Sequence, residues 1–274
     1  TGQVARELAW LARPGLDIVT RGRTETDLTD PAACAAAIAA APYDAVINAA
    51  AWTAVDAAEN QQAEAQRLNA GLPKQLAEYA KANKARLVHY SSDYVYPGTG
   101  TTPWQETSAT GPLSVYGQTK LQGDEAIQKS GADHLVFRTS WVYSARGNNF
   151  MKTMLRLAES KTELNIVADQ IGAPTPARLI AQVTALAIHS KLQAGLYHLA
   201  PTGETSWQGF AKEIFRLAGK NTKANPIPTS DYPTPATRPL NSRMDVTKLQ
   251  QALNIQLPDW QSQLALTLGE YLEN

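Results

Sequence analysis

The chain has 274 residues, with 25 Lys and Arg against 25 Asp and Glu and a pI of about 6.9. A balanced charge gives no basic surplus for binding a nucleic-acid backbone, and no apolar run approaches the roughly 20 residues of a membrane span, so we expect neither nucleic acid nor membrane as a partner. A single cysteine, Cys34, and four scattered histidines predict no disulfide, no metal centre and a cytoplasmic location.

Short β-branched runs alternate with longer helical stretches in the first half of the chain. Strands are expected over 16–20, 45–49, 86–91 and 134–139, with helices beginning near Pro31 and Gln61. This alternation predicts an α/β protein with a Rossmann-like, doubly wound parallel sheet. The runs at 86–91 and 134–139 are almost continuously apolar, which is typical of strands covered by helices on both faces.

The chain opens directly on a helical stretch that follows Gly2. Because a parallel nucleotide-binding sheet starts with a strand, we expect the first strand of the fold to be missing from this sequence. Gly2 would then belong to a phosphate-binding turn at the start of a helix. An ordinary N-terminal loop is the alternative.

The pattern loosens after about Asn148. The segments 169–176 and 225–239 contain Gly and Pro and are expected to be irregular, extended chain, and a last helix is expected from about Pro258. A smaller C-terminal substrate-binding domain is therefore predicted over 148–175, 201–239 and 256–274. The NAD(P)-binding domain would take 1–147 with parts of 176–200 and 240–255.

Tyr116 and Lys120 stand four residues apart in a stretch that reads as a helix as far as Gln128. That spacing places both side chains on one helix face. An adjacent ammonium favours the phenolate and should lower the tyrosine pKa toward the working range of an acid-base catalyst. An exposed helix pair is the alternative for this motif taken alone.

Ser91 and Ser92 follow a buried strand about two dozen residues upstream of that pair. A hydroxyl at this place can polarise a substrate carbonyl, to which Tyr116 would donate a proton while a nicotinamide supplies hydride and Lys120 tunes the phenol. The alternative for the serines is a helix cap or turn.

Taken together, these motifs resemble the extended short-chain dehydrogenase/reductases, and within them the dTDP-4-dehydrorhamnose reductases, over nearly the whole chain. The resemblance is carried by Gly2-Gln3-Val4, Asn48-Ala49-Ala50-Ala51, Thr53-Ala54-Val55-Asp56, Ser92-Asp93-Tyr94-Val95-Tyr96, Tyr116-Gly117-Gln118-Thr119-Lys120, Arg138-Thr139-Ser140-Trp141-Val142-Tyr143, Asp169-Gln170-x-Gly172-x-Pro174-Thr175 and Arg238-Pro239-x-Asn241-Ser242-Arg243. Ala5, Trp52 and Tyr96 depart from the residues usual in that family.

The resemblance implies reduction of the 4-keto group of dTDP-4-dehydro-6-deoxy-L-mannose to dTDP-L-rhamnose by NADPH or NADH, in a homodimer. It implies catalytic roles for Tyr116, Lys120 and Ser92. Carried over by position, the cofactor contacts are Gly2, Gln3, Val4, Asp27, Leu28, Ala49, Ala50, Ala51, Trp52 and Thr53, together with Tyr116 and Lys120. The substrate contacts are Ser92, Asp93, Trp141, Asn149 and Arg243, and no metal is implied.

Arg21 and Arg23 follow the second predicted strand, where an arginine can bind the 2′-phosphate of NADP, and no acidic residue stands at the strand end. This favours NADPH over NADH; two solvated surface arginines are the alternative. His89 and His198 fall in strand-like runs and are expected to be hydrogen-bonded core residues. For Trp104 two positions are equally compatible with the sequence, facing the cleft or covering the core.

Two other functions remain open from the sequence. A non-catalytic NADP-binding subunit, similar to the regulatory β-subunit of methionine adenosyltransferase, would have this fold without turnover. A nucleotide-sugar epimerase or dehydratase would also share it, but dehydratases of this superfamily commonly have Asp-Glu after the hydroxyl residue, and here Asp93 precedes Tyr94.

Overall fold

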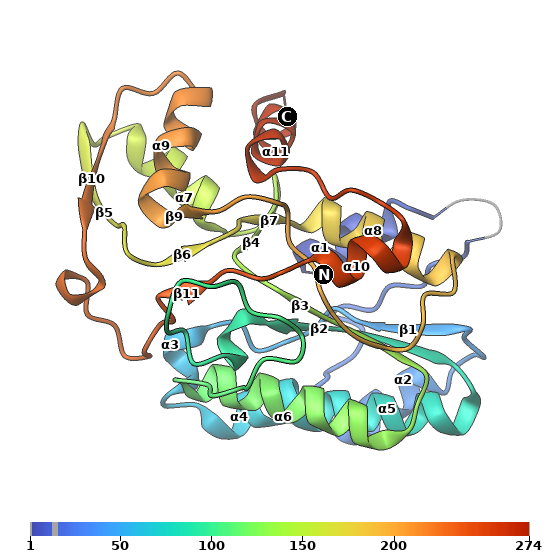
Figure 1. The fold of residues 1–274 in the computed structure, drawn as a ribbon. Coiled ribbons are helices and arrows are strands. Elements are labelled where there is room, and N and C mark those ends of the chain that lie inside the picture. Colours follow the sequence, from blue (N-terminus) through green and yellow to red (C-terminus); the bar gives the residue numbers. More distant parts are fainter. Residues whose placement is uncertain (1, 13–15, 274) are drawn as a thin grey trace.

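A four-stranded parallel sheet lies at the centre of the computed structural model, which describes residues 2–12 and 16–273 (Figure 1). Its strands, in spatial order, are β1 (Ala45–Asn48), β2 (Arg86–Ser92), β3 (His134–Thr139) and β8 (Gly195–His198). All neighbouring pairs are parallel, so the carboxyl ends of the strands meet at one edge. The predicted α/β class with a parallel sheet is confirmed.

Helices cover both faces of this sheet (Figure 1). One face packs against α1 (Gln3–Ala9), α8 (Ala177–His189) and α10 (Thr247–Leu253). The other side carries α2 (Pro31–Ile38), α3 (Val55–Ala58), α4 (Gln62–Gln66), a π-helical turn (Arg67–Gly71), α5 (Leu72–Asn83) and α6 (Val115–Ser130).

Successive residues of the central strands enter two different apolar cores. Leu87 and Val136 pack with α5 and α6, whereas Val88, Leu135 and Phe137 pack with α8. All five side chains are fully buried. Burial on both faces explains why these two runs are continuously apolar instead of alternating.

The strand expected over 16–20 is wrong. Only Leu16 takes part in a β-bridge, and residues 17–20 have no regular structure, with Val19 64% exposed. A strand is held by the hydrogen bonds of a neighbouring strand, and in the described part of the chain β1 pairs only with β2. A β-branched run alone is therefore not sufficient to form a strand.

A separate apolar core lies beyond the carboxyl edge of the sheet, between α7 (Phe150–Ala158), α9 (Trp207–Leu217) and α11 (Trp260–Glu273). A parallel ribbon of β5 (Glu163–Val167) and β10 (Lys223–Ile227) packs beside α9. The expectation of irregular chain from Asn225 is thus wrong for its first three residues. Pro226 fits a strand here because a two-stranded ribbon has a free edge.

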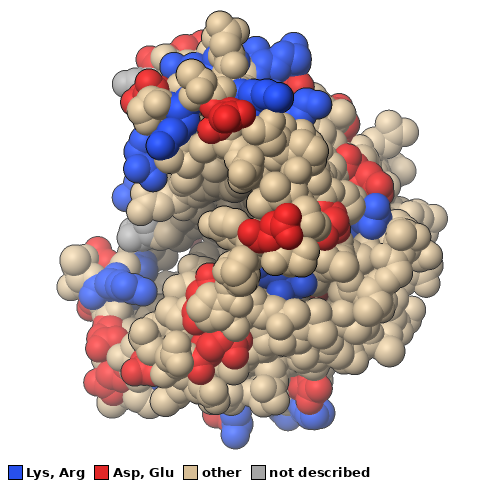
Figure 2. All heavy atoms as spheres, turned by 90° about the vertical axis from the view of Figure 1, so that its left-hand side faces the viewer, with Lys and Arg blue, Asp and Glu red and all other residues tan. Residues whose placement is uncertain are grey.

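Short pairs of strands connect this second core with the main sheet. They are β4 (Val142–Tyr143) with β7 (Thr175–Pro176), and β6 (Ile171–Gly172) with both β9 (Thr205–Ser206) and β11 (Asn241–Ser242). Figure 2 shows that the surface is hollowed between the upper part of the molecule and the lower part, which contains the helices under the sheet. Among the described helices, none is both long and apolar enough to cross a bilayer.

Charged side chains tie α1 and α8 to α11. Arg178 of α8 pairs with Glu7 of α1 (3.0 Å) and with Glu270 of α11 (2.7 Å), and Arg146 also pairs with Glu270. The Arg146 guanidinium lies 3.9 Å from the centre of the Trp10 ring. Helices from both ends of the chain therefore share one cluster of ion pairs.

Candidate active site

Two glycines let α6 pack closely, Gly117 against the turn that follows β2 and Gly123 against the π-helical turn. A Cβ atom at Gly117 would lie 2.3 Å from the carbonyl oxygen of Tyr94, and one at Gly123 would lie 2.1 Å from that of Asn69. Real Cβ atoms do not approach an oxygen so closely, so only glycine permits this packing. The Ser114 hydroxyl caps the helix by accepting the Gly117 N–H (3.2 Å).

Lys120 points inward from α6 and is 2% exposed. Its Nζ donates to the carbonyl oxygen of Tyr90 (2.6 Å) and lies 3.4 Å from Nε2 of His89. Burial lowers the Lys120 pKa to about 8, against the opposing charge of Asp124. The exposed-pair alternative is therefore wrong for this lysine. An ammonium has three donors; the Tyr90 carbonyl takes one and His89 Nε2 takes another when it is unprotonated, so at least one donor is left for a ribose hydroxyl, as the resemblance requires.

Tyr116 lies beside Ser92, but its pKa moves opposite to expectation. Burial raises the Tyr116 pKa to about 12, and a hydrogen bond with the Ser92 side chain opposes that rise. The expected lowering by Lys120 is wrong because the lysine Nζ bonds to Tyr90 and His89 instead. The Tyr94 ring packs edge-on against the Tyr116 ring, with the centroids 5.3 Å apart. Tyr116 is thus held as a neutral phenol.

Ser92 and Asp93 form a buried polar pair at the end of β2. The Ser92 hydroxyl donates to Oδ1 of Asp93 (3.0 Å) and accepts the Tyr94 N–H (3.2 Å), which also fulfils the capping role considered for it. Burial raises the Asp93 pKa to about 6, although hydrogen bonds with Ser242 and Ser92 oppose it. Ser242, from β11, belongs to the 238–243 motif of the resemblance, but no role was predicted for it because its position beside Asp93 depends on the fold.

A second buried polar group lies behind Lys120. Asp124 accepts a hydrogen bond from Arg138 Nε (3.0 Å), and Arg138 also donates to the Tyr96 hydroxyl (2.8 Å), which lies 2.6 Å from His198 Nε2. The Trp104 ring stacks on Tyr96 at 5.0 Å. His89 and His198 are confirmed as hydrogen-bonded core residues, and Trp104 covers the core.

The predicted pyrophosphate turn lies beside two other predicted site segments. Gly2 faces the carbonyl oxygen of Ala49 at the end of β1, where even an added Cβ would be 4.0 Å away. Gln3 accepts a hydrogen bond from the Asn149 side chain (3.0 Å), and Val4 packs against the core under α8. Asn149 also caps α7 by accepting the Lys152 N–H (3.2 Å). In this structure the Asn149 side-chain amide therefore forms its hydrogen bonds with other groups of the protein.

Asn69 fixes the segment 49–53 against α6. Its amide accepts the Trp52 N–H (2.9 Å) and donates to the Trp52 carbonyl (3.1 Å) and the Thr119 hydroxyl (3.1 Å). Asn69 is fully buried in the π-helical turn, a distortion frequent at functional sites. Asn69 was not predicted from the sequence, because a short polar residue within a helix gives no sign of contacts with residues far away in the chain.

The predicted adenine contacts, Asp27 and Leu28, lie in the segment that precedes α2. Leu28 packs in one apolar cluster with Ala50 and Trp52. Asp27 is exposed and accepts hydrogen bonds from the backbone and hydroxyl of Thr29 (2.9 and 2.7 Å), which lower its pKa. Arg21 is exposed on the same segment.

Trp141 adopts an unusual backbone conformation at the end of β3, with φ of 50°. Its ring stacks on Trp207 of α9, with the centroids 3.8 Å apart. Trp207 is fixed in turn by a hydrogen bond from its Nε1 to Gln170 (3.1 Å). The close approach of Gly172, whose added Cβ would lie 3.2 Å from the Trp141 ring, completes this platform. Trp207 was not predicted, since only the fold places it there.

The two arginines of the 238–243 segment have different partners. Arg238 forms a two-pronged pair with Asp56 (2.9 and 2.7 Å), which joins this segment to α3. Arg243 pairs with Glu204 (2.7 Å). Thus Ser242, rather than either arginine, is the residue that this segment brings to the Ser92–Asp93 pair.

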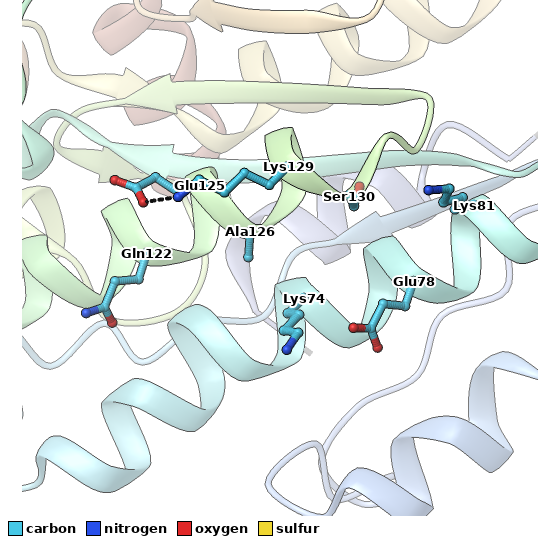
Figure 3. A pocket seen from close by; sticks show the side chains of 8 residues that line it. All are labelled: Lys74, Glu78, Lys81, Gln122, Glu125, Ala126, Lys129 and Ser130. Atoms are coloured by element: carbon cyan, nitrogen blue, oxygen red, sulfur yellow. Dashed lines mark hydrogen bonds and ion pairs between the residues drawn. The ribbon is translucent and has the colours of Figure 1, made fainter.

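A groove on the outer surface is distinct from this site. It runs between α5 and α6 and is lined by Lys74, Glu78, Lys81, Gln122, Glu125, Ala126, Lys129 and Ser130 (Figure 3). Glu125 and Lys129 pair across one helical turn (2.8 Å). Its mixed, exposed charges contrast with the buried Lys120 on the inner face of α6.

Comparison with known proteins shows the family of this chain. Residues 1–273 match the family model described as RmlD substrate binding domain. A dTDP-4-dehydrorhamnose reductase of Shigella flexneri is 46% identical, over 98% of this chain and 95% of that protein. A solved dTDP-4-dehydrorhamnose reductase of Clostridium acetobutylicum superposes with a TM-score of 0.94 at 34% identity, covering 100% of this chain and 97% of that one. One from Bacillus anthracis, solved in complex with NADP, has a TM-score of 0.94 at 31% identity, covering 98% and 96%. The chain belongs to the dTDP-4-dehydrorhamnose reductase family.

Proposed function

We propose that this chain reduces the 4-keto group of dTDP-4-dehydro-6-deoxy-L-mannose to give dTDP-L-rhamnose, with NADPH or NADH as the reductant. The observation that carries the proposal is the buried Lys120, four residues after a neutral Tyr116 that lies beside Ser92. The names of the reductases to which the chain is similar supply the substrate. The NADP complex of the Bacillus anthracis relative favours a phosphorylated cofactor.

When bound, a nicotinamide cofactor would supply the hydride that reduces the keto carbon. Tyr116 gives the proton to the carbonyl oxygen, and its raised pKa keeps the phenol protonated at neutral pH, as a proton donor must be. Ser92 orients that oxygen, for which its hydroxyl turns from Asp93 to the substrate. Lys120 binds the cofactor ribose with a donor that its protein partners leave unused.

The remaining site assignments are part of the proposal. Gly2, Gln3 and Val4 would receive the pyrophosphate, Asp27 and Leu28 the adenine, and Ala49 to Thr53 the nicotinamide side of the cofactor. Trp141 would hold the sugar against the Trp207 platform. Asn149 would act by positioning Gln3, and Arg243 at the rim of the site. A division into two domains is supported by two separate apolar cores, although Tyr143, Ala173 and Leu257 each belong to the core opposite to the one that the limits above give them.

The test is a spectrophotometric assay of NADPH oxidation with a dTDP-4-keto-6-deoxy sugar, comparing the unmodified protein with Tyr116→Phe. Loss of a general acid predicts a fall in kcat on the order of 10²-fold or more. Retained NADPH binding and an unchanged melting temperature would show that the variant is folded. No turnover by the unmodified protein, or equal turnover by both, would refute the proposal. Cofactor binding without turnover would favour a regulatory subunit.

Cofactor preference and oligomeric state are each tested by a separate measurement. If Arg21 binds the 2′-phosphate, KM for NADPH should be below KM for NADH, and Arg21→Ala should raise only the former. The homodimer implied by the family stays a prediction, which light scattering in solution decides.

A further inference from the structure

Three buried side chains connect the end of β1 with α6. Nδ2 of Asn48 lies 3.1 Å from Nδ1 of His89, and Nε2 of the same imidazole lies 3.4 Å from Nζ of Lys120. Their exposed fractions are 4%, 0% and 2%. Water is thus excluded from this row, so each polar atom has to find its partner within the protein.

The hydrogen bonds of Asn48 determine which nitrogen of His89 carries the proton. Oδ1 of Asn48 accepts the Ala50 N–H (3.2 Å), so the NH₂ group is the part of the amide that faces His89. Burial and the neighbouring Lys120 charge keep the His89 pKa well below its usual range, so the ring is neutral and has one N–H and one lone pair. Nδ1 must accept from Asn48, which leaves the proton on Nε2.

This tautomer is incompatible with a charged Lys120. An ammonium has donors only, and the Nε2–H would face it without an acceptor between them. An uncharged amine accepts the Nε2–H through its lone pair. With the ammonium form, Nε2 must be the acceptor, Nδ1 must carry the hydrogen, and the Asn48 amide must turn its oxygen to His89 and release the Ala50 N–H.

We propose that His89, oriented by its hydrogen bond with Asn48, is a positioning residue whose tautomer depends on the charge of Lys120. Its Nε2 accepts a hydrogen bond from the ammonium form of Lys120 and donates one to the free amine. His89 carries one proton in both states, so the single proton lost is that of Lys120. The Ala50 N–H is bound by Asn48 only in the second state, which couples the lysine charge to the segment 49–53. The inference rests on the proposed function only for the use of Lys120 beside Tyr116.

Other charges near Lys120 set the balance between the two states. Asp124, on the next turn of α6, favours the ammonium, while its own partner Arg138 on β3 offsets part of that charge. The Tyr90 carbonyl on β2 also accepts from the ammonium. Tyr116 on α6 is neutral until it donates its proton. Burial opposes them all, so both states are accessible near neutral pH.

The decisive measurement is ¹⁵N NMR of the full chain labelled at histidine, with and without NADPH, because protonated and unprotonated ring nitrogens have well-separated shifts. Comparison with His89→Gln assigns the His89 signals among those of the four histidines. We expect His89 to stay neutral and to change tautomer, from Nδ1–H to Nε2–H, as the pH rises through about 8. In Lys120→Met the ring should carry Nε2–H at every pH. A single tautomer in the unmodified protein, or the same change in Lys120→Met, would overturn the inference.

The pH profile of kcat gives an independent readout. His89→Leu removes the acceptor of a charge-assisted hydrogen bond, so the midpoint assigned to Lys120 should fall by about one pH unit, and His89→Gln should restore it. Identical profiles for all three proteins would contradict the inference. A pH-dependent tautomer in a protein without turnover would leave the inference standing and refute the proposed function, whereas turnover with a fixed tautomer would do the reverse.

Discussion

Asp93→Asn should make the folded protein more stable at neutral pH. Asp93 is 1% exposed, and burial raises its pKa to about 6 from an ordinary value of 3.8. Asparagine has nearly the same shape, keeps an oxygen to accept the Ser92 hydroxyl, and carries no charge. The substitution therefore removes an ionised group from a place where ionisation is unfavourable.

The pKa difference gives both the sign and the size of the effect. Because the folded pKa lies above the unfolded one, the stability that protonated Asp93 contributes is complete below pH 3.8 and is lost as the pH rises through about 6. About two pKa units correspond to about 3 kcal/mol of unfolding free energy. Above pH 6 we expect Asp93→Asn to be more stable than the unmodified protein by up to this amount, relative to their difference at pH 4.

Urea unfolding of both proteins between pH 4 and 8 measures this difference directly. Asp169→Asn is the matched control, since Asp169 is exposed and accepts three hydrogen bonds from Thr229, which keep its pKa below 3.8. Its loss should lower stability above pH 4. If the stability difference between Asp93→Asn and the unmodified protein is the same at pH 4 and pH 8, burial does not raise the Asp93 pKa as expected.

Four further substitutions test α6, the residues packed against it and, as a control, α11. Lys120→Met should abolish turnover. It should also raise the unfolding free energy at pH 7 by up to about 3 kcal/mol, because the Lys120 pKa of about 8 in the folded protein lies below the ordinary 10.5. This gain in stability should vanish by about pH 11, where Lys120 is uncharged in both the folded and the unfolded protein. Gly123→Ala should lower stability by about 1–3 kcal/mol in the same urea assay, whereas Gly269→Ala in α11, where a Cβ meets nothing within 4 Å, should raise it by about 0.5–1 kcal/mol. Asn69→Ala removes the side chain that accepts the Trp52 N–H. It should therefore raise KM for NADPH and have a smaller effect on KM for the sugar. An equal rise in both KM values would contradict the placement of segment 49–53 on the cofactor side.

Patterns that local chemistry determines were readable from the sequence. The apolar runs that became β2 and β3 are buried on both faces, and the spacing of Tyr116 and Lys120 places both in the site because an α-helix has a fixed pitch. Gly117 was part of the recognised motif and Gly123 was not, and the close approach that requires glycine at both positions became visible only with the fold.

What the sequence did not reveal depends on neighbours supplied by distant chain. Residues 17–20 have strand-like composition and no described strand beside them, while Pro226 lies in a strand because β5 pairs with it on one side. Trp207 reaches Trp141 from another helix. The expected lowering of the Tyr116 pKa was also wrong. The four-residue spacing to Lys120 is a local pattern, whereas the Tyr90 carbonyl that accepts a hydrogen bond from Lys120 Nζ belongs to β2.

The ion-pair cluster around Glu270 has a practical consequence for handling the protein. Arg178 and Arg146 connect α11 to α1, whose first residues carry the proposed pyrophosphate turn. A purification tag or a truncation that disturbs the last turns of α11 would therefore act on cofactor affinity, although it lies outside the cofactor site. Expression vectors should keep α11 intact and follow it with a flexible linker.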